Sequence, residues 1–205
     1  MKKLLFMTML ALGASISHAQ YYGFRGGFNL ANIGADAENN SIRPGFHIGA
    51  YYQSTLSDKL LFEPEVQLSF QGANADDDAL GFDQSITMLN VPLMAKYLVN
   101  DEFSVNAGPY IGLILGAEAK ADDDDFDNKD FFNSLDFGLG LGASYELPSG
   151  INLSIRYLLG LADITDDEGG TETVIIDNFP VEVEVEEQRI TNQVIQFSVG
   201  YLINK

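Results

Sequence analysis

Residues Leu135–Glu146 read LDFGLGLGASYE, and this stretch decides the fold. Its odd-numbered positions are Leu, Phe, Leu, Leu, Ala and Tyr, whereas its even-numbered positions are Asp, Gly, Gly, Gly, Ser and Glu. A period of two residues is that of a β-strand whose successive side chains point to opposite faces. The stretch also has at least the length, roughly 9–11 residues, that a tilted strand needs to cross a bilayer. It therefore predicts a membrane-spanning strand with one apolar and one polar face.

The same alternation occurs in seven further stretches, which are 22–30, 46–56, 60–70, 89–99, 103–115, 151–161 and 195–203. Their charged residues all fall on one face, and the opposite face has none. The polar face is rich in Gly, Ser, Asn and Gln, which suits a narrow interior better than a solvated coat. We therefore expect an all-β fold, an eight-stranded antiparallel transmembrane β-barrel. A secreted soluble β-sandwich is the alternative, because such sandwiches also alternate.

The connections between these stretches are alternately long and short. Residues 31–44, 72–84, 121–133 and 163–190 form long connections, whereas 57–59, 100–101 and 148–150 are tight. Outer-membrane barrels have short periplasmic turns and longer extracellular loops. The pattern predicts both termini on the periplasmic side and four long loops outside the cell.

Aromatic residues on the apolar face support the same orientation, because two aromatic belts are expected at the membrane interfaces. Phe28, Phe46, Phe70 and Phe137 lie near the outer ends of the stretches. A predicted periplasmic girdle consists of Tyr22, Tyr52, Phe62, Tyr97, Phe103, Tyr145 and Tyr201.

Residues 1–19 are typical of a secretory signal peptide, and residues 20–205 would form the barrel domain. Lys2 and Lys3 precede an apolar run, and Ser17 and Ala19 place small residues at the expected cleavage site. The 205 residues include 11 basic and 30 acidic side chains, a formal net charge of −19, and no cysteine. This balance excludes nucleic acid as a partner, since phosphate binding needs clustered cations. Most of the acidic residues lie in the four long connections.

The charged residues of the polar face would meet inside the barrel. An eight-stranded barrel is just wide enough for its own side chains, so a solute pore is not expected. We predict a lumenal ion-pair network of Arg25, Glu63, Glu65, Lys96, Asp136, Glu146 and Arg156. A catalytic carboxylate pair among these residues is the less favoured alternative.

His47, the single histidine after residue 19, would point into the lumen near the outer mouth. Hydrolysis would need a nucleophile beside it, and the sequence places no Ser–His–Asp grouping there. We expect a hydrogen-bonding role for His47, with no catalytic residues and no cofactor.

Asp123, Asp125 and Asp127 have the spacing of calcium ligands, but Asn128 and Ser134 replace the glycine and the final acidic ligand of an EF-hand. Looser binding of divalent cations by the acidic loops is a weak hypothesis, and solvated loops that repel one another are the alternative.

Two further features concern the strands. Pro64, Pro92 and Pro109 lie inside predicted strands, where each removes a ladder hydrogen bond and should mark a bulge or local distortion. Residues 173–187 alternate again around a turn at 177–180, which predicts a hairpin that extends the last two strands beyond the membrane. Such an edge could add a strand from a partner.

The chain resembles the PorT-like family of small Gram-negative outer-membrane β-barrels over essentially all of residues 20–205. The segments that carry the resemblance are FRGGFNL at 24–30, RPGFHIG at 43–49, FEPEV at 62–66, LNVPL at 89–93, AGPYIG at 107–112 and FGLGLG at 137–142. The resemblance implies the outer membrane, no cofactor and, in some members, help with protein export to the surface. Such barrels often end on an aromatic residue, whereas this chain ends Ile203, Asn204 and Lys205, so Tyr201 takes that place.

We therefore expect a monomeric, non-enzymatic integral outer-membrane protein that is structural or assists protein export to the cell surface. A surface adhesion or recognition module that acts through its loops is the alternative. The expected partners are outer-membrane lipid and lipopolysaccharide, the barrel-insertion machinery, and a surface or secretion partner protein.

Overall fold

The structure is a computed structural model that describes residues 20–34, 40–75, 83–121, 124–165, 170–176, 179–185 and 190–203. The predicted signal peptide, residues 1–19, lies outside the described residues. Within the described ranges, no helix has the length and apolar character needed to cross a membrane.

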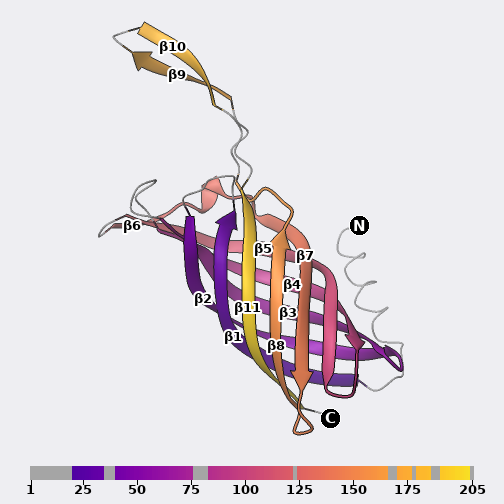
Figure 1. The fold of residues 1–205 in the computed structure, drawn as a ribbon. Coiled ribbons are helices and arrows are strands. Elements are labelled where there is room, and N and C mark those ends of the chain that lie inside the picture. The colour runs from indigo at the N-terminus through magenta and orange to yellow at the C-terminus, as the bar shows by residue number, and fades with distance from the viewer. Residues whose placement is uncertain are drawn as a thin grey trace, which may run out of the picture.

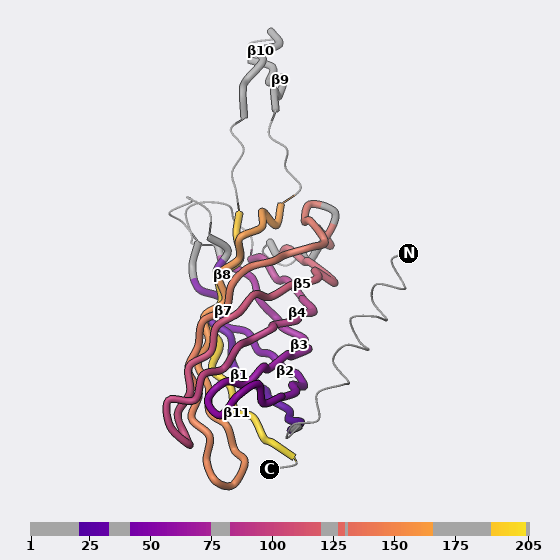
Figure 2. Tube along the Cα trace, turned by 90° about the vertical axis from the view of Figure 1, so that its right-hand side faces the viewer, coloured from indigo at the N-terminus to yellow at the C-terminus, as the bar shows by residue number. Residues whose placement is uncertain are grey.

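Eight antiparallel strands close into a barrel (Figure 1). They are β1 (Gln20–Gly34), β2 (Asn40–Ser57), β3 (Leu60–Ala75), β4 (Asp83–Leu98), β5 (Phe103–Ala121), β7 (Leu135–Glu146), β8 (Ile151–Gly160) and β11 (Thr191–Leu202). Each strand pairs with the next one along the chain, β11 pairs with β1, and the pairing of β4 with β5 completes the ring. Figure 2 shows the same strands from a side turned by 90°. The predicted eight-stranded barrel is confirmed.

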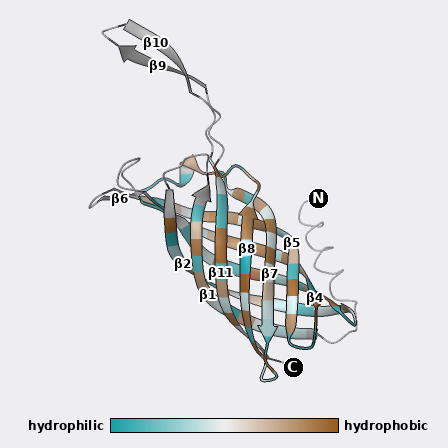
Figure 3. Cartoon of the chain, viewed as in Figure 1, coloured by the Kyte–Doolittle hydropathy of each residue, from teal (hydrophilic) through white to brown (hydrophobic). Residues whose placement is uncertain are grey.

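Apolar and polar residues alternate along the strands (Figure 3), and the apolar ones are exposed on the outer wall whereas the polar ones are buried in the lumen. In β7 and β11 exposed and buried residues alternate along most of the strand. Phe28 is 73% exposed on the outside, whereas Asn29 beside it is completely buried. A closed sheet has no unpaired edge, so this wall can contact hydrocarbon without leaving backbone groups unsatisfied.

The two ends of the barrel differ. The turn end carries the tight connections 58–59, 99–102 and 147–150, and the loop end carries the long ones. At the turn end, the Asn100 side-chain oxygen accepts hydrogen bonds from the backbone N–H groups of Glu102 and Phe103. Gly150 has a φ of +87°, which a residue with a side chain rarely adopts.

Several strands extend further toward the loop end than predicted. β1 continues to Gly34, β3 continues to Ala75, and β2 already begins at Asn40. The predicted connection 121–133 also contains strand β6 (Asp124–Asp127), which pairs with β5, and the short 3₁₀ helix η1 (Lys129–Phe131). Alternation did not reveal these extensions, because the added residues are mostly polar or small. These added residues are in strands because their backbone groups continue the hydrogen-bonded pairing with the adjacent strands.

The strands around the barrel have unequal lengths. β2, β3, β4 and β5 have 16–19 residues, whereas β7, β8 and β11 have 10–12. Because their turn ends lie together, the wall formed by β7 and β8 is lower at the loop end.

Pro64, Pro92 and Pro109 interrupt the ladder without changing its register. Pairs are missing beside Pro64 toward β2, beside Pro92 toward β3 and beside Pro109 toward β4, and the pairing resumes in the same register. The register shifts occur elsewhere, for example between Thr87 and Met88. These three prolines therefore cause local gaps and not bulges, whereas Pro44 of β2 lies within the register shift between Ile42 and His47.

The predicted hairpin in the last connection forms, but it does not extend the barrel strands. β9 (Gly170–Ile176) and β10 (Phe179–Val185) pair with each other as a separate two-stranded sheet. β8 ends at Gly160, and β11 begins only at Thr191. The chain leaves the ladder after β8 because the N–H groups of Leu161 and Ala162 both donate to the carbonyl oxygen of Phe137.

Candidate functional site

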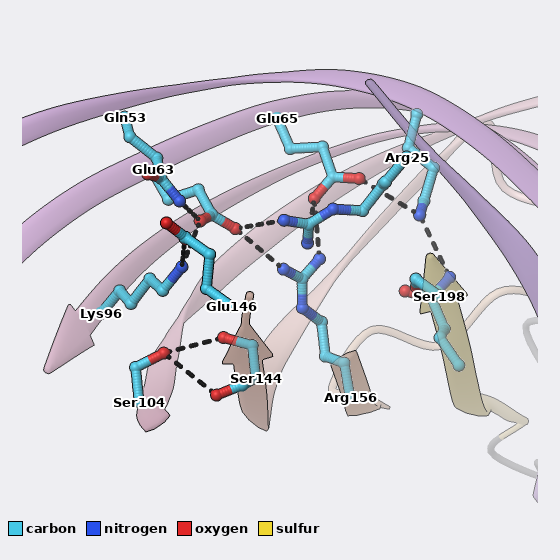
Figure 4. Close-up of polar contacts among 12 residues, drawn as sticks. Arg25, Gln53, Glu63, Glu65, Lys96, Ser104, Ser144, Glu146, Arg156 and Ser198 are labelled. Atoms are coloured by element: carbon cyan, nitrogen blue, oxygen red, sulfur yellow. Dashed lines mark hydrogen bonds and ion pairs between the residues drawn. The ribbon is translucent and has the colours of Figure 1, made fainter. Parts of the chain in front are cut away.

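Four charged side chains cross the middle of the lumen (Figure 4). Glu63 and Glu65 project from β3, Arg25 projects from β1 and Arg156 from β8, and all four are buried. Arg25 lies 2.7 Å from a Glu63 oxygen and 3.1 Å from a Glu65 oxygen. Arg156 lies 2.9 Å from Glu65 and 3.6 Å from Glu63. Each guanidinium thus bridges both carboxylates, which is how buried charges offset their lost hydration.

Lys96 of β4 extends this network toward the turn end. Its Nζ lies 3.5 Å from Glu63 and 3.6 Å from Glu146 of β7. Gln53 of β2 donates a 2.7 Å hydrogen bond to the second Glu63 oxygen. Lys96, Glu146 and Gln53 also line a cavity of about 270 Å³ at the turn end. Three cations and three carboxylates from five strands therefore join the wall across the lumen, and their charges balance.

Asp136 is the one predicted member that does not join the network. Its carboxylate accepts a 2.9 Å hydrogen bond from the Tyr110 hydroxyl and a 3.5 Å hydrogen bond from the Asn192 amide. Asp136 shares the inward face of β7 with Glu146, but ten residues of strand separate them, about 30 Å at the usual rise. Alternation identifies the face of a residue and not its height, which is why the sequence grouped them.

Sequence reasoning missed an aromatic partner of the network. The Tyr51 ring of β2 lies 4.2 Å from the Arg25 guanidinium carbon, a cation–π contact. Gly23 pairs with Tyr51, and a Cβ at Gly23 would lie 2.4 Å from the ring. Because Gly23 has no side chain, the Tyr51 ring can occupy this position.

His47 lies in a second group of buried polar residues. Its Nδ1 is 2.7 Å from the Asn29 side-chain oxygen, and its Nε2 is 2.8 Å from the Ser198 hydroxyl. The Asn29 amide nitrogen donates to the carbonyl oxygens of Phe46 and Phe70, so its oxygen must face His47. Nδ1 therefore carries the proton and Nε2 accepts from Ser198. The sequence placed no Ser–His–Asp grouping around His47, and it did not reveal that Ser198 and Asn29 would be its partners.

The serine hydroxyl of this Ser–His–Asn arrangement is not open to the neighbouring groove on the outer wall. An apolar groove of about 520 Å³ on the outer wall includes Ser198 among its lining residues, with Phe28 and Phe197. The Ser198 hydroxyl points into the lumen, whereas Phe28 and Phe197 belong to the outward row. The hydrogen-bonded β1–β11 ladder, in which Gly27 pairs with Ser198, separates the hydroxyl from the groove. The arrangement fits a hydrogen-bonded contact among three strands.

We expect the variant His47→Ala to leave the structure of lipid A unchanged and to lower barrel stability by about 1–3 kcal/mol, because buried partners lose hydrogen bonds. Mass spectrometry of lipid A from variant and parent cells tests the first part, and urea unfolding tests the second. Ser198→Ala should behave in the same way. Loss of a lipid A modification in both variants would instead identify the pair as catalytic.

The aromatic residues of the predicted girdle lie on the outer wall toward the turn end. Tyr22, Tyr97, Phe103, Tyr145 and Tyr201 are exposed there. Tyr52 contacts Tyr22 at a ring separation of 5.3 Å, and Phe62 is half-buried. Toward the loop end, Phe46 and Phe70 stack at 4.3 Å. The role of these rings at a membrane interface stays a prediction.

The candidate cation ligands are only partly described. Asp123 lies outside the described residues, and Asp125 and Asp127 belong to β6. The Asp127 carboxylate accepts a 3.0 Å hydrogen bond from the backbone of Lys129. No group of three or more acidic, histidine or cysteine side chains suited to a metal occurs in the described part of the chain. Divalent-cation binding by the loops stays a prediction.

Known proteins provide a comparison for this arrangement. The family described as the outer membrane protein β-barrel domain matches residues 15–166. No curated protein matches the chain in sequence. Neisserial surface protein A is similar in structure, with a TM-score of 0.55 at 11% identity over 90% of this chain and 99% of that one.

Two other solved structures are similar. The attachment invasion locus protein of Yersinia pestis has a TM-score of 0.49 at 9% identity over 91% of this chain and 99% of that one. OprG from Pseudomonas aeruginosa has a TM-score of 0.47 at 16% identity over 92% of this chain and 98% of that one. The matched family extends over most of the closed barrel and its lumenal residues. The chain therefore belongs to the outer membrane protein β-barrel domain family.

Proposed function

We propose that this protein is a non-enzymatic outer-membrane barrel that holds its loops at the cell surface. It either has a structural role in the membrane or assists protein export to the cell surface. The closed lumen is the observation that supports this proposal. Four paired charged side chains cross its middle, Lys96 and Glu146 extend them toward the turn end, and an interior of this size leaves little space beyond side chains. A barrel sealed in this way acts through its outer surface and not by passing solutes.

The loop end is the proposed site of action, and a surface or secretion partner protein is the proposed partner. β9 and β10 pair only with each other within the described residues, so each strand leaves an outer edge. Such an edge can accept a strand from a partner by main-chain hydrogen bonds. The same observation favours the second candidate function, surface adhesion or recognition.

The proposal includes the environment of the barrel. Outer-membrane lipid and lipopolysaccharide would surround the exposed apolar wall, and the insertion machinery would recognise the last strand during assembly. We propose cleavage after Ala19 and a monomeric barrel.

A deletion strain tests the function when it is complemented with the full chain or with a chain that lacks residues 173–187. If the protein assists export, surface proteins should accumulate inside the deletion strain, and only the full chain should restore their protease accessibility. If adhesion is its function, export should stay normal while partner binding is lost. Heat-modifiable gel mobility verifies that the shortened chain still folds. Normal export and normal adhesion in the deletion strain would contradict both proposals.

A further inference from the structure

Asp136 on β7 carries a buried carboxylate that no described side chain neutralises. It is completely buried near the loop end of the lumen, and no described lysine, arginine or histidine forms an ion pair with it. The three cations of the ion-pair network are already matched by three other carboxylates. A buried charge in a protein is normally paired or coordinates a metal ion. Asp136 therefore needs a partner that the described side chains do not provide.

One oxygen of Asp136 is arranged as a hydrogen-bond acceptor. Oδ2 accepts a 2.9 Å hydrogen bond from the Tyr110 hydroxyl and a 3.5 Å hydrogen bond from the Asn192 amide nitrogen. The same Asn192 nitrogen donates to the side-chain oxygen of Gln71 at 2.5 Å, which fixes the orientation of this amide. Because both neighbours of Oδ2 donate to it, these surroundings suit an ionised carboxylate.

The other oxygen of Asp136 and a neighbouring amide have no hydrogen-bond partner. Asp136 Oδ1 and both polar atoms of the Asn90 side chain, on β4, are buried without a partner in the described part of the chain. A neutral acid would not satisfy them, because a proton on Oδ1 would itself be a buried donor without an acceptor. Buried polar atoms of this kind indicate an ordered water molecule or an ion.

Gly112 of β5 brings these unpartnered groups to one place. It pairs with Asn90 on one side and with Asp136 on the other, so the three residues form one row on the lumenal face. A Cβ at Gly112 would lie 2.7 Å from Asn90 Oδ1 and 3.5 Å from the Cβ of Asp136. The Met88 methyl group lies 2.7 Å from the same point, and its unbranched side chain adapts readily. The absence of a side chain at Gly112 thus allows a small ion to lie between the amide and the carboxylate.

We propose that Asp136 and Asn90 bind a monovalent metal cation the size of Na⁺ over Gly112, with water molecules as further ligands. Carboxylate and amide oxygens are ligands of hard cations. Water alone would satisfy the hydrogen bonds of these oxygens, but it would leave the charge of Asp136 unbalanced. The ion is monovalent because a calcium site usually has several carboxylates, whereas this row has one.

The charge of the loop end favours a cation as well. The chain has a formal net charge of −19, and most of its acidic residues lie in the four long connections. Such a field raises the local concentration of cations. The cation site would exist whether the barrel assists export or has a structural role.

Urea unfolding at constant ionic strength tests for the cation. The full-length protein in phosphatidylcholine vesicles is titrated with NaCl, while choline chloride keeps the total salt at about 0.3 M and the screening constant. If one ion binds only the folded chain, each tenfold increase in Na⁺ above the dissociation constant should lower the unfolding equilibrium constant about tenfold. Asp136→Asn should abolish this dependence, whereas Asp58→Asn in the exposed turn should retain it.

A second pair of variants keeps the charge of Asp136. Asn90→Leu removes the amide ligand and should lose most of the Na⁺ dependence. Asn152→Leu is the matched control, because Asn152 is also buried with both side-chain polar atoms unpartnered, but it lies toward the turn end of β8. Heat-modifiable mobility verifies that each variant folds.

Three results would overturn the proposal. A parent chain that unfolds independently of Na⁺ would show that no such ion is bound. An unchanged Na⁺ dependence in Asp136→Asn would place the ion elsewhere. If Asp136→Asn fails to fold, an Asn90→Leu chain that responds to Na⁺ like Asn152→Leu leads to the same conclusion.

Discussion

Glu63→Gln is expected to lower the free energy of unfolding by about 3–5 kcal/mol, the usual cost of removing one partner from a buried ion-pair network. Glu63 contacts Arg25, Lys96 and Arg156 within 3.6 Å, and all four side chains are almost completely buried. The amide has nearly the same shape as the carboxylate, so packing is preserved. The loss arises because three buried cations would then face two carboxylates.

Urea unfolding in lipid vesicles measures this effect. Asp58→Asn in the exposed β2–β3 turn removes the same charge from the surface and should change stability by less than about 1 kcal/mol. The double variant Glu63→Gln with Lys96→Met restores equal numbers of cations and carboxylates, and it should recover part of the loss. If Glu63→Gln unfolds at the same urea concentration as Asp58→Asn, the network does not stabilise the barrel.

The fold could be predicted from the sequence because its main signal is local. A two-residue period reports the face of each side chain without any knowledge of its neighbours. Arg25, Glu63 and Lys96 were therefore assigned to the lumen, where the structure places them. The tight turns were also visible, because few residues join consecutive strands.

The contacts inside the lumen were less predictable, because they depend on register around the whole ring. His47 meets Ser198 across 151 residues, and this contact requires the β1–β11 closure. Asp136 shows the same limit of the sequence pattern. It lies on the lumenal face, as predicted, but too far along the barrel axis to join the ion-pair network. The packing of Ile164 and Ile190 at the loop end was not visible in the sequence, because both residues lie in a long connection and outside the strand stretches.

Strand lengths were underestimated for a related reason. The added residues of β1, β2 and β3 are mostly polar or small, so their pattern resembles that of loops. Their pairing follows from neighbouring strands that already lie alongside. The unequal height of the wall follows from these extensions and could not be predicted from single stretches.

The outer wall is expected to tolerate a charge only near its ends, and Phe197→Arg measures this. Phe197 is 46% exposed and pairs with Phe28 on one side and Ile155 on the other, in the middle of the lipid-facing wall. An arginine at the bilayer midplane should lower the free energy of unfolding by about 2–4 kcal/mol, because its charge would enter hydrocarbon.

Tyr201→Arg is the matched control on the same face of β11. Tyr201 lies four residues closer to the turn end, where it pairs with Phe24 and Ile151. An arginine there can extend its charge to the headgroups, so the expected loss is only about 0–1 kcal/mol. Urea unfolding of both variants in vesicles gives the difference directly. A larger loss in the free energy of unfolding for Phe197→Arg places the middle of the wall in hydrocarbon. Equal losses for the two variants would mean that both positions have the same surroundings, which is incompatible with a wall that crosses a bilayer.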